Sequence, residues 1–126
     1  MYEITAGAGK HQILLRVWRS GQGCIGSLTG GEEPHVGGVI LAVPRPSLTG
    51  SGLSCDIWSI PVPGHLDNEA ALSLAKQLCV KVEAPVSLTS GIHIDKAGAA
   101  DIARIKSNCE SALAELMSQM TQEPQP

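Results

Sequence analysis

The segment GGEEPHVGGVILAV, residues 30–43, joins a predicted turn or loop to a predicted buried strand. Paired glycines and Pro34 in its first half mark a turn or loop. The second half, VGGVILAV (36–43), is apolar at both odd and even positions, which is typical of a strand that is covered on both faces. We therefore expect part of the second face of the sheet to be buried by a partner protein chain.

Short strands separated by glycine turns are expected on both sides of this segment. QILLRVWR (12–19) alternates in the period of a strand, SGQG (20–23) is a hairpin-type break, and CIGSLTG (24–30) follows. After residue 43, the connection PRPSLTGSGLS (44–54) leads to a further apolar segment, CDIWSIPV (55–62). Because the connection is long and rich in Pro, Gly and Ser, we expect it to be mobile or to cover another part of the protein.

The second half of the chain changes to a helical period. Asp67 or Asn68 can cap a helix that runs to about Val80, with Leu74 and Leu78 on one face. APVSLTSGIHID (84–95) predicts one more strand. A last helix follows, with Gly98 as its N-cap, Asp101 in its first turn and an apolar stripe of Ile102, Ile105, Cys109, Ala112, Leu116 and Met120.

These elements predict an α+β fold, with a mostly antiparallel sheet of about five to six strands and two helices packed on one face. We expect a single domain over residues 1–120 and a disordered tail over residues 121–126, TQEPQP.

Composition excludes several classes of protein. The net charge is −3 and the basic residues are scattered, which argues against a nucleic-acid or anionic-membrane surface. Only three aromatic residues are present, Tyr2, Trp18 and Trp58, so no row of base-stacking platforms is available. The first residues resemble no signal peptide and no apolar run spans a membrane, so we expect a cytoplasmic protein.

The four cysteines, Cys24, Cys55, Cys79 and Cys109, are far apart in the sequence. No CxxC pair is present for zinc binding or redox chemistry. Two disulfides would suit a secreted domain, but no other feature suggests secretion. We expect free and mostly buried thiols.

Three of the four histidines, His35, His65 and His93, follow apolar segments at breaks next to Gly or Pro. If the strand in VSLTSGIHID stays extended, His93 and Asp95 project side by side on one face. Such a pair can orient a base, bind a cation or hold a ligand. The alternative is that Asp95 caps the following turn and that each imidazole is solvated or bonded to backbone.

Other functional motifs are weak. GAGKH (7–11) lacks the first glycine and the final Ser/Thr of a P-loop and suits a hairpin turn, while GGEEPHVGG and PGHLDNEA can present backbone N–H groups to an anion. His35, His65, His93 and Asp95 could form a zinc site, but no ligand pair has the spacing of a structural zinc motif, and we expect no metal. No nucleophile elbow accompanies Ser90.

Three motifs in the same order, GGEEPHVGGVILAV, PGHLDNEAALSLAKQL and SLTSGIHIDKAGAADIARI, resemble the prenylated-flavin chaperone-like family typified by the small accessory component of gallate decarboxylase. The resemblance covers about residues 29–116. It implies a fold similar to that of proteasome assembly chaperones. It also implies a non-catalytic accessory protein that binds or delivers prenylated FMN to the large subunit of a UbiD-type decarboxylase of gallate or another aromatic acid.

Carried over motif by motif, the resemblance implies a ligand-binding set of Gly31, Glu32, His35, Gly37, His65, Asp67, Gly91, His93 and Asp95. A homodimer or higher oligomer is expected. Two alternatives stay open: an assembly factor without a small ligand, and a small enzyme with His93 as base and Asp95 as its orienter. Some relatives carry the inherited label putative amino acid decarboxylase, for which the chain offers no lysine in a pyridoxal-phosphate setting.

Overall fold

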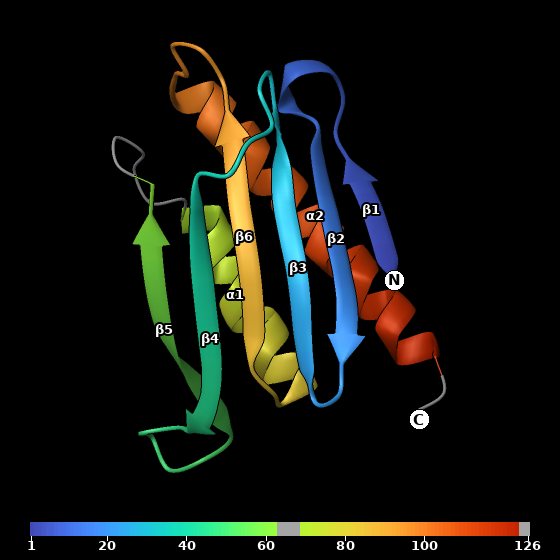
Figure 1. The fold of residues 1–126 in the computed structure, drawn as a ribbon, viewed down its shortest axis with the longest axis vertical. Helices are drawn as coiled ribbons and strands as arrows, with labels where there is room; N and C mark the ends of the chain where they lie inside the picture. The colour runs from blue at the N-terminus through green and yellow to red at the C-terminus, as the bar shows by residue number, and fades with distance from the viewer. Residues whose placement is uncertain (63–68, 124–126) are drawn as a thin grey trace.

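The computed structural model describes residues 1–62 and 69–123, and this part of the chain forms six strands, two α-helices and a short 3₁₀ helix (Figure 1). The strands are β1 (Tyr2–Ala6), β2 (Ile13–Ser20), β3 (Gly23–Gly31), β4 (Gly38–Pro46), β5 (Leu53–Pro61) and β6 (Val86–His93). The helices are η1 (Gly9–His11), α1 (Glu69–Val82) and α2 (Ala99–Gln122).

All six strands belong to one sheet with the order β1-β2-β3-β6-β4-β5. Neighbouring strands are antiparallel, except that β3 and β6 are parallel. The predicted α+β fold with a mostly antiparallel sheet is thus confirmed. The last strand in the sequence, β6, is inserted between β3 and β4, which are consecutive in the chain.

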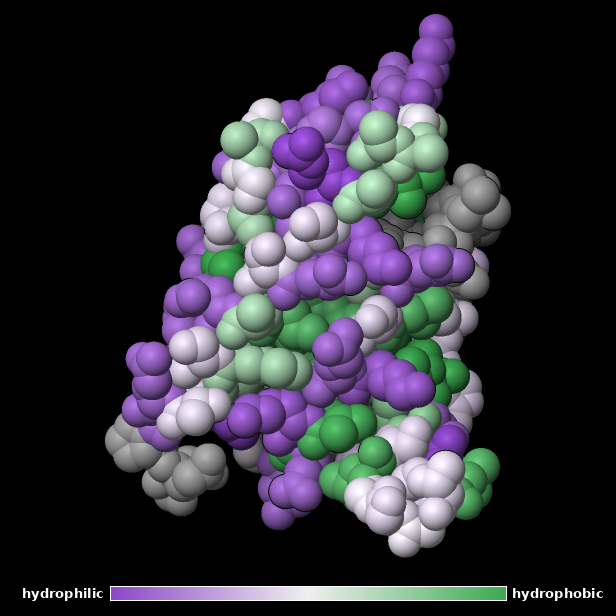
Figure 2. Space-filling model, turned by 180° about the vertical axis from the view of Figure 1, so that it is seen from behind, coloured by the Kyte–Doolittle hydropathy of each residue, from purple (hydrophilic) through white to green (hydrophobic). Residues whose placement is uncertain are grey.

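Both helices cover the same face of the sheet and lie behind it in Figure 1. Figure 2 shows this side from behind, with hydrophilic residues spread over much of its surface. The core lies between the two layers and consists mainly of aliphatic side chains with little or no exposed surface, among them Ile13, Leu15, Val17, Leu28, Leu74, Leu78, Val86, Leu88 and Leu116. No helix packs on the opposite side of the sheet in the described residues, and we call that side the open face.

The prediction of a long connection over residues 44–54 is wrong. β4 continues to Pro46 and β5 begins at Leu53, with Pro44 paired to Cys55 and Pro46 to Leu53. Beyond Ala42, β4 has no registered partner in β6, so its second edge is free at both prolines. Proline lacks the N–H of a strand ladder and is tolerated at such a free edge. The turn between the two strands therefore covers only residues 47–52.

The final helix follows its predicted apolar stripe except at Ile102, which is 62% exposed. The first turn of α2 contacts η1 through Asp101 rather than the core. α2 extends to Gln122, past the predicted start of the tail at residue 121, and Glu123 accepts a hydrogen bond from the Tyr2 hydroxyl. Within the described ranges, neither α-helix combines the length and the apolar character that a membrane span needs.

The connection from β3 to β4, residues 32–37, has to cross β6 (Figure 1). Backbone hydrogen bonds hold it there: the Glu32 N–H donates to the His93 carbonyl at 2.7 Å and the Gly37 N–H to the Ser90 carbonyl at 2.7 Å. The crossing is so close that a Cβ on Gly91 would lie 1.6 Å from the His35 carbonyl oxygen. Only glycine fits at residue 91 in this backbone arrangement.

A polar cluster ties η1 to the start of α2. Asp101 accepts hydrogen bonds from the His11 imidazole at 2.8 Å and from the Gly98 N–H at 3.0 Å, and Lys10 Nζ lies 3.4 Å away. Asn108 donates to the His11 carbonyl at 2.8 Å. The Gly98 bond, followed by those from His11 and Lys10, lowers the pKa of Asp101 from 3.8 to about 2. The predicted N-cap at Gly98 is confirmed, whereas the role of His11 was not predicted.

Gly91→Ala tests the crossing. The added methyl group has to displace the backbone of residue 35, so we expect a loss of about 1–3 kcal/mol in the free energy of unfolding. Gly98→Ala is the control, because its Cβ would meet nothing closer than Asp101 Oδ2 at 4.0 Å and its cost should be about 1 kcal/mol or less. Chemical denaturation measures both. Equal stability of Gly91→Ala and wild type would contradict the crossing.

The lowered pKa of Asp101 predicts that part of the stability of the fold is lost in acid. Its pKa is lower in the folded chain than its ordinary value of 3.8, so the contribution is complete above that value and is lost as the pH falls toward about 2. Asp101→Asn should lower the melting temperature at neutral pH. It should also reduce the fall in melting temperature that wild type shows between about pH 4 and 2. Melting curves across that range measure both effects. If the melting temperature of the variant falls in acid as much as that of wild type, Asp101 is not the group responsible.

Candidate functional site

Most of the predicted site residues meet where residues 32–37 cross β6. Gly31 ends β3, Glu32, His35 and Gly37 belong to the crossing connection, and Gly91, His93 and Asp95 belong to β6 and its exit. The structure therefore brings together seven residues from two of the three sequence motifs. We call this group the crossing site.

The third motif supplies His65 and Asp67, which lie outside the described residues 1–62 and 69–123. Their membership of the site stays a prediction. Val62, the last described residue before them, donates its N–H to the Gly37 carbonyl at 2.8 Å, so the chain leaves β5 next to the crossing connection.

The glycines of the crossing site allow close approach of backbone. Gly31 has a φ of +78°, and a Cβ there would lie 2.3 Å from the His93 carbonyl oxygen. Together with Gly91, it lets the connection lie directly on β6. A Cβ on Gly37 would lie 3.1 Å from His35 Nε2, so this glycine leaves room for the imidazole.

The two described histidines of the site lie side by side. The ring centroids of His35 and His93 are 6.2 Å apart with an interplanar angle of 78°, an edge-to-face arrangement. His35 Nδ1 lies 2.8 Å from the Glu33 carbonyl oxygen. Because a carbonyl only accepts hydrogen bonds, Nδ1 carries a proton. The connection thus sets both the position and the tautomer of His35.

His93 and Asp95 project in the same direction, as the strand period predicted. His93 Nε2 lies 3.5 Å from Asp95 Oδ1, with the two side chains 43% and 84% exposed. Such an exposed pair contributes little to stability. The carboxylate orients the imidazole, since it favours a proton on the facing nitrogen.

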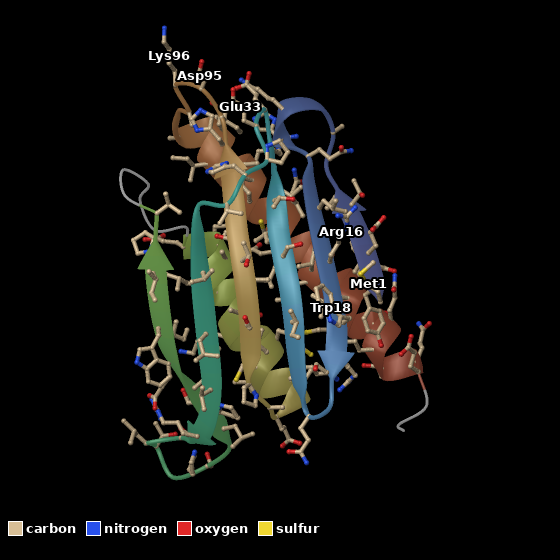
Figure 3. All side chains as sticks on the ribbon, viewed as in Figure 1. Met1, Arg16, Trp18, Glu33, Asp95 and Lys96 are labelled. Atoms are coloured by element: carbon tan, nitrogen blue, oxygen red, sulfur yellow. The ribbon has the colours of Figure 1, made fainter. Side chains whose placement is uncertain are left out.

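Carboxylates surround the histidine pair on the solvent side. Glu32 Oε1 accepts the Asp95 N–H at 2.9 Å and so joins the connection to the exit of β6. Glu33 lies in the same connection, while Asp95 and Lys96 extend beyond the end of the sheet and Lys96 points away from it (Figure 3). The site therefore combines two imidazoles with negative charge, which suits a polar ligand edge better than a phosphate.

Metal or thiol chemistry finds no support in the described part of the chain. No group of three or more His, Cys, Asp or Glu residues there could hold a metal ion. All four cysteines are free and buried, as predicted. Burial raises the pKa of Cys109 to about 12 and that of Cys79 to about 11, so neither thiol ionises near neutral pH.

The tryptophans are exposed on the open face. Trp18 is 40% exposed and Trp58 is 54% exposed, so neither is a core residue. The alternation of CDIWSIPV indicates that Trp58 is exposed, because Cys55 is buried and Asp56 is exposed in the same strand.

Comparison with known proteins gives a family and a similar fold. The model of the prenylated flavin chaperone LpdD-like domain matches residues 7–121. No curated protein matches the chain. A chain in the crystal structure of a novel chaperone complex for yeast 20S proteasome assembly is similar in fold, with a TM-score of 0.52 at 10% identity over 95% of this chain and 93% of that chain. At that identity, the likeness concerns the fold alone.

The fold that the sequence resemblance implied, similar to that of proteasome assembly chaperones, is thereby confirmed. The family match spans β2 to β6 and nearly all of α2, and it includes every residue of the crossing site. The chain belongs to the prenylated flavin chaperone LpdD-like family.

Proposed function

We propose that this protein is a non-catalytic accessory protein that binds prenylated FMN and delivers it to the large subunit of a UbiD-type decarboxylase. The observation that carries the proposal is the crossing of β6, which sets His35 and His93 side by side in a chain of the flavin chaperone family. Gallate or another aromatic acid is the substrate of that partner. Cytoplasmic action and a homo-oligomeric state remain predictions from the sequence.

The residues present suit one part of the cofactor. A flavin ring system has a polar edge that carries carbonyl acceptors and a ring N–H donor. Neutral His35, with its proton directed at the Glu33 carbonyl, and neutral His93, with its proton directed at Asp95, each have an acceptor as their other ring nitrogen, which suits that N–H. Val36, between them and β4, is 62% exposed and offers an apolar contact. Glu32, Glu33 and Asp95 repel a phosphate, so the phosphate points away from this side of the site.

When bound, the prenylated flavin supplies the decarboxylation chemistry, which belongs to the large subunit. In this chain, the crossing site holds and orients the ring edge. His93 is positioned by Asp95, and His35 by the Glu33 carbonyl. Such a site is suited to binding and release rather than to bond cleavage, because both histidines are partly exposed and all four thiols are buried away from them.

An assembly factor without a small ligand is the second candidate. The observation that favours it is the open face, where Trp58 and Ile60 are 54% and 67% exposed. Copurification with a UbiD-like protein in the absence of flavin would support this candidate. An enzyme that uses His93 and Asp95 gains no comparable support from the described residues.

Native mass spectrometry with prenylated FMN, and with FMN as the control ligand, tests the proposal. We expect a mass increase with prenylated FMN only. His35→Ala and His93→Ala should each raise the dissociation constant about tenfold or more, equivalent to about 1.4 kcal/mol, because each removes a hydrogen-bond partner of the ring edge. Their melting temperatures should stay close to that of wild type.

His11→Ala is the matched control, since His11 contacts Asp101 instead of the crossing site. It should lower the melting temperature and leave flavin affinity unchanged. Normal affinity in His35→Ala and His93→Ala would make these histidines structural and would remove the proposed binding mode.

A further inference from the structure

Two aliphatic side chains lie next to the crossing site on the open face. Val39 of β4 and Ile60 of β5 are cross-strand partners, and they are 43% and 67% exposed. Side chains in such a pair are in contact and form one surface. We call Val39 and Ile60 the aliphatic ledge. The next pair, Leu41 and Trp58, extends the apolar surface away from the crossing site.

The strand register places the ledge beside the crossing connection. Val39 also pairs with Thr89 of β6, and Thr89 is two residues, or about 7 Å, from Gly91 in the same strand. A Cβ on Gly91 would meet the His35 carbonyl oxygen, so the connection covers the face on which Thr89 and Val39 lie. The ledge and His35 are therefore on the same face of the sheet, one residue pair apart.

The imidazole of His35 extends to the β4 side of this crossing. A Cβ on Gly37 would lie 3.1 Å from His35 Nε2, which places that nitrogen next to Gly37. Gly37 precedes Val39 by two residues, and its carbonyl accepts the N–H of Val62, two residues after Ile60. A ligand that contacts His35 therefore has the ledge beside it.

The surroundings of the ledge are polar. On β3 and β6, the open face next to it carries short hydroxyl side chains, at Ser27, Thr29, Ser87 and Thr89. The carboxylates of the crossing site lie at its other end, where Glu32 accepts the Asp95 N–H at the exit of β6. The ledge is thus an aliphatic border of a site whose other borders are hydroxyls and carboxylates.

The histidines alone leave one property of the proposed ligand unexplained. FMN and prenylated FMN share the polar edge of the ring system, so hydrogen bonds from His35 and His93 to that edge do not distinguish the two. The prenyl unit is a branched aliphatic group joined to the ring system beside the polar edge, where FMN has none. Selectivity therefore needs an apolar contact that only the prenylated ligand makes.

We propose that the aliphatic ledge receives the prenyl unit and makes the crossing site selective for prenylated FMN over FMN. This inference rests on the proposed function and adds the residues that discriminate between the two ligands. With the polar edge of the ring system at the two histidines, Val39 and Ile60 form the aliphatic surface next to it. Contact with the prenyl unit removes apolar area of both partners from water.

Equilibrium titration of the full chain with prenylated FMN, and with FMN at the higher concentrations that a weaker ligand needs, tests the ledge. Val39→Thr and Ile60→Thr keep a β-branched side chain for the strand but replace an alkyl branch by a hydroxyl. Each should raise the dissociation constant for prenylated FMN about fivefold or more and change that for FMN less than about twofold. Circular dichroism and melting curves verify that both variants fold.

Leu41→Thr is the matched control, because Leu41 is 42% exposed on the same face but belongs to the next pair away from the crossing site. It should change neither dissociation constant. An equal loss of affinity in Leu41→Thr would overturn the inference, since the whole apolar surface would then be involved. If wild type binds prenylated FMN and both ledge variants keep its selectivity, the inference alone is wrong. Wild type that binds neither flavin removes the proposed function, and this inference with it.

Discussion

Residues 32–37 have to cross β6 because β6 lies between β3 and β4 in the sheet, and Gly91 leaves room for that crossing. The contact is between backbone atoms, so no larger residue at position 91 can be accommodated without moving the connection. The same crossing orders His35 over His93 and joins Glu32 to the N–H of Asp95. One topological feature thereby builds the candidate site from segments that are about sixty residues apart in the sequence.

The two-layer architecture has a second consequence. Both helices are used to cover one side of the sheet, and the aliphatic core is confined to that side. The opposite side keeps its alternate residues in contact with solvent, including both tryptophans. The helices therefore leave this side of the sheet, with the crossing connection over its end, uncovered in the described part of the chain.

The sequence predicted the local elements well where a clear period was present. The alternation of residues 12–19 and the parity of His93 and Asp95 both agree with the structure, because a strand fixes the direction of each successive side chain. The apolar stripe of α2 is correct from Ile105 onward. The prediction failed at Pro44 and Pro46, where proline suggested a loop but an edge without a second partner tolerates it in a strand.

By itself, the sequence determined the fold class, the burial of the four thiols and the motifs of the candidate site, since periodicity and glycine placement are local properties. Only the tertiary structure decided that β6 enters the middle of the sheet, that His35 meets His93, and that His11 instead contacts Asp101. These contacts join segments distant in the chain, and strand order determines which of them meet. No local pattern encodes strand order, because it depends on how all of the elements share a single core.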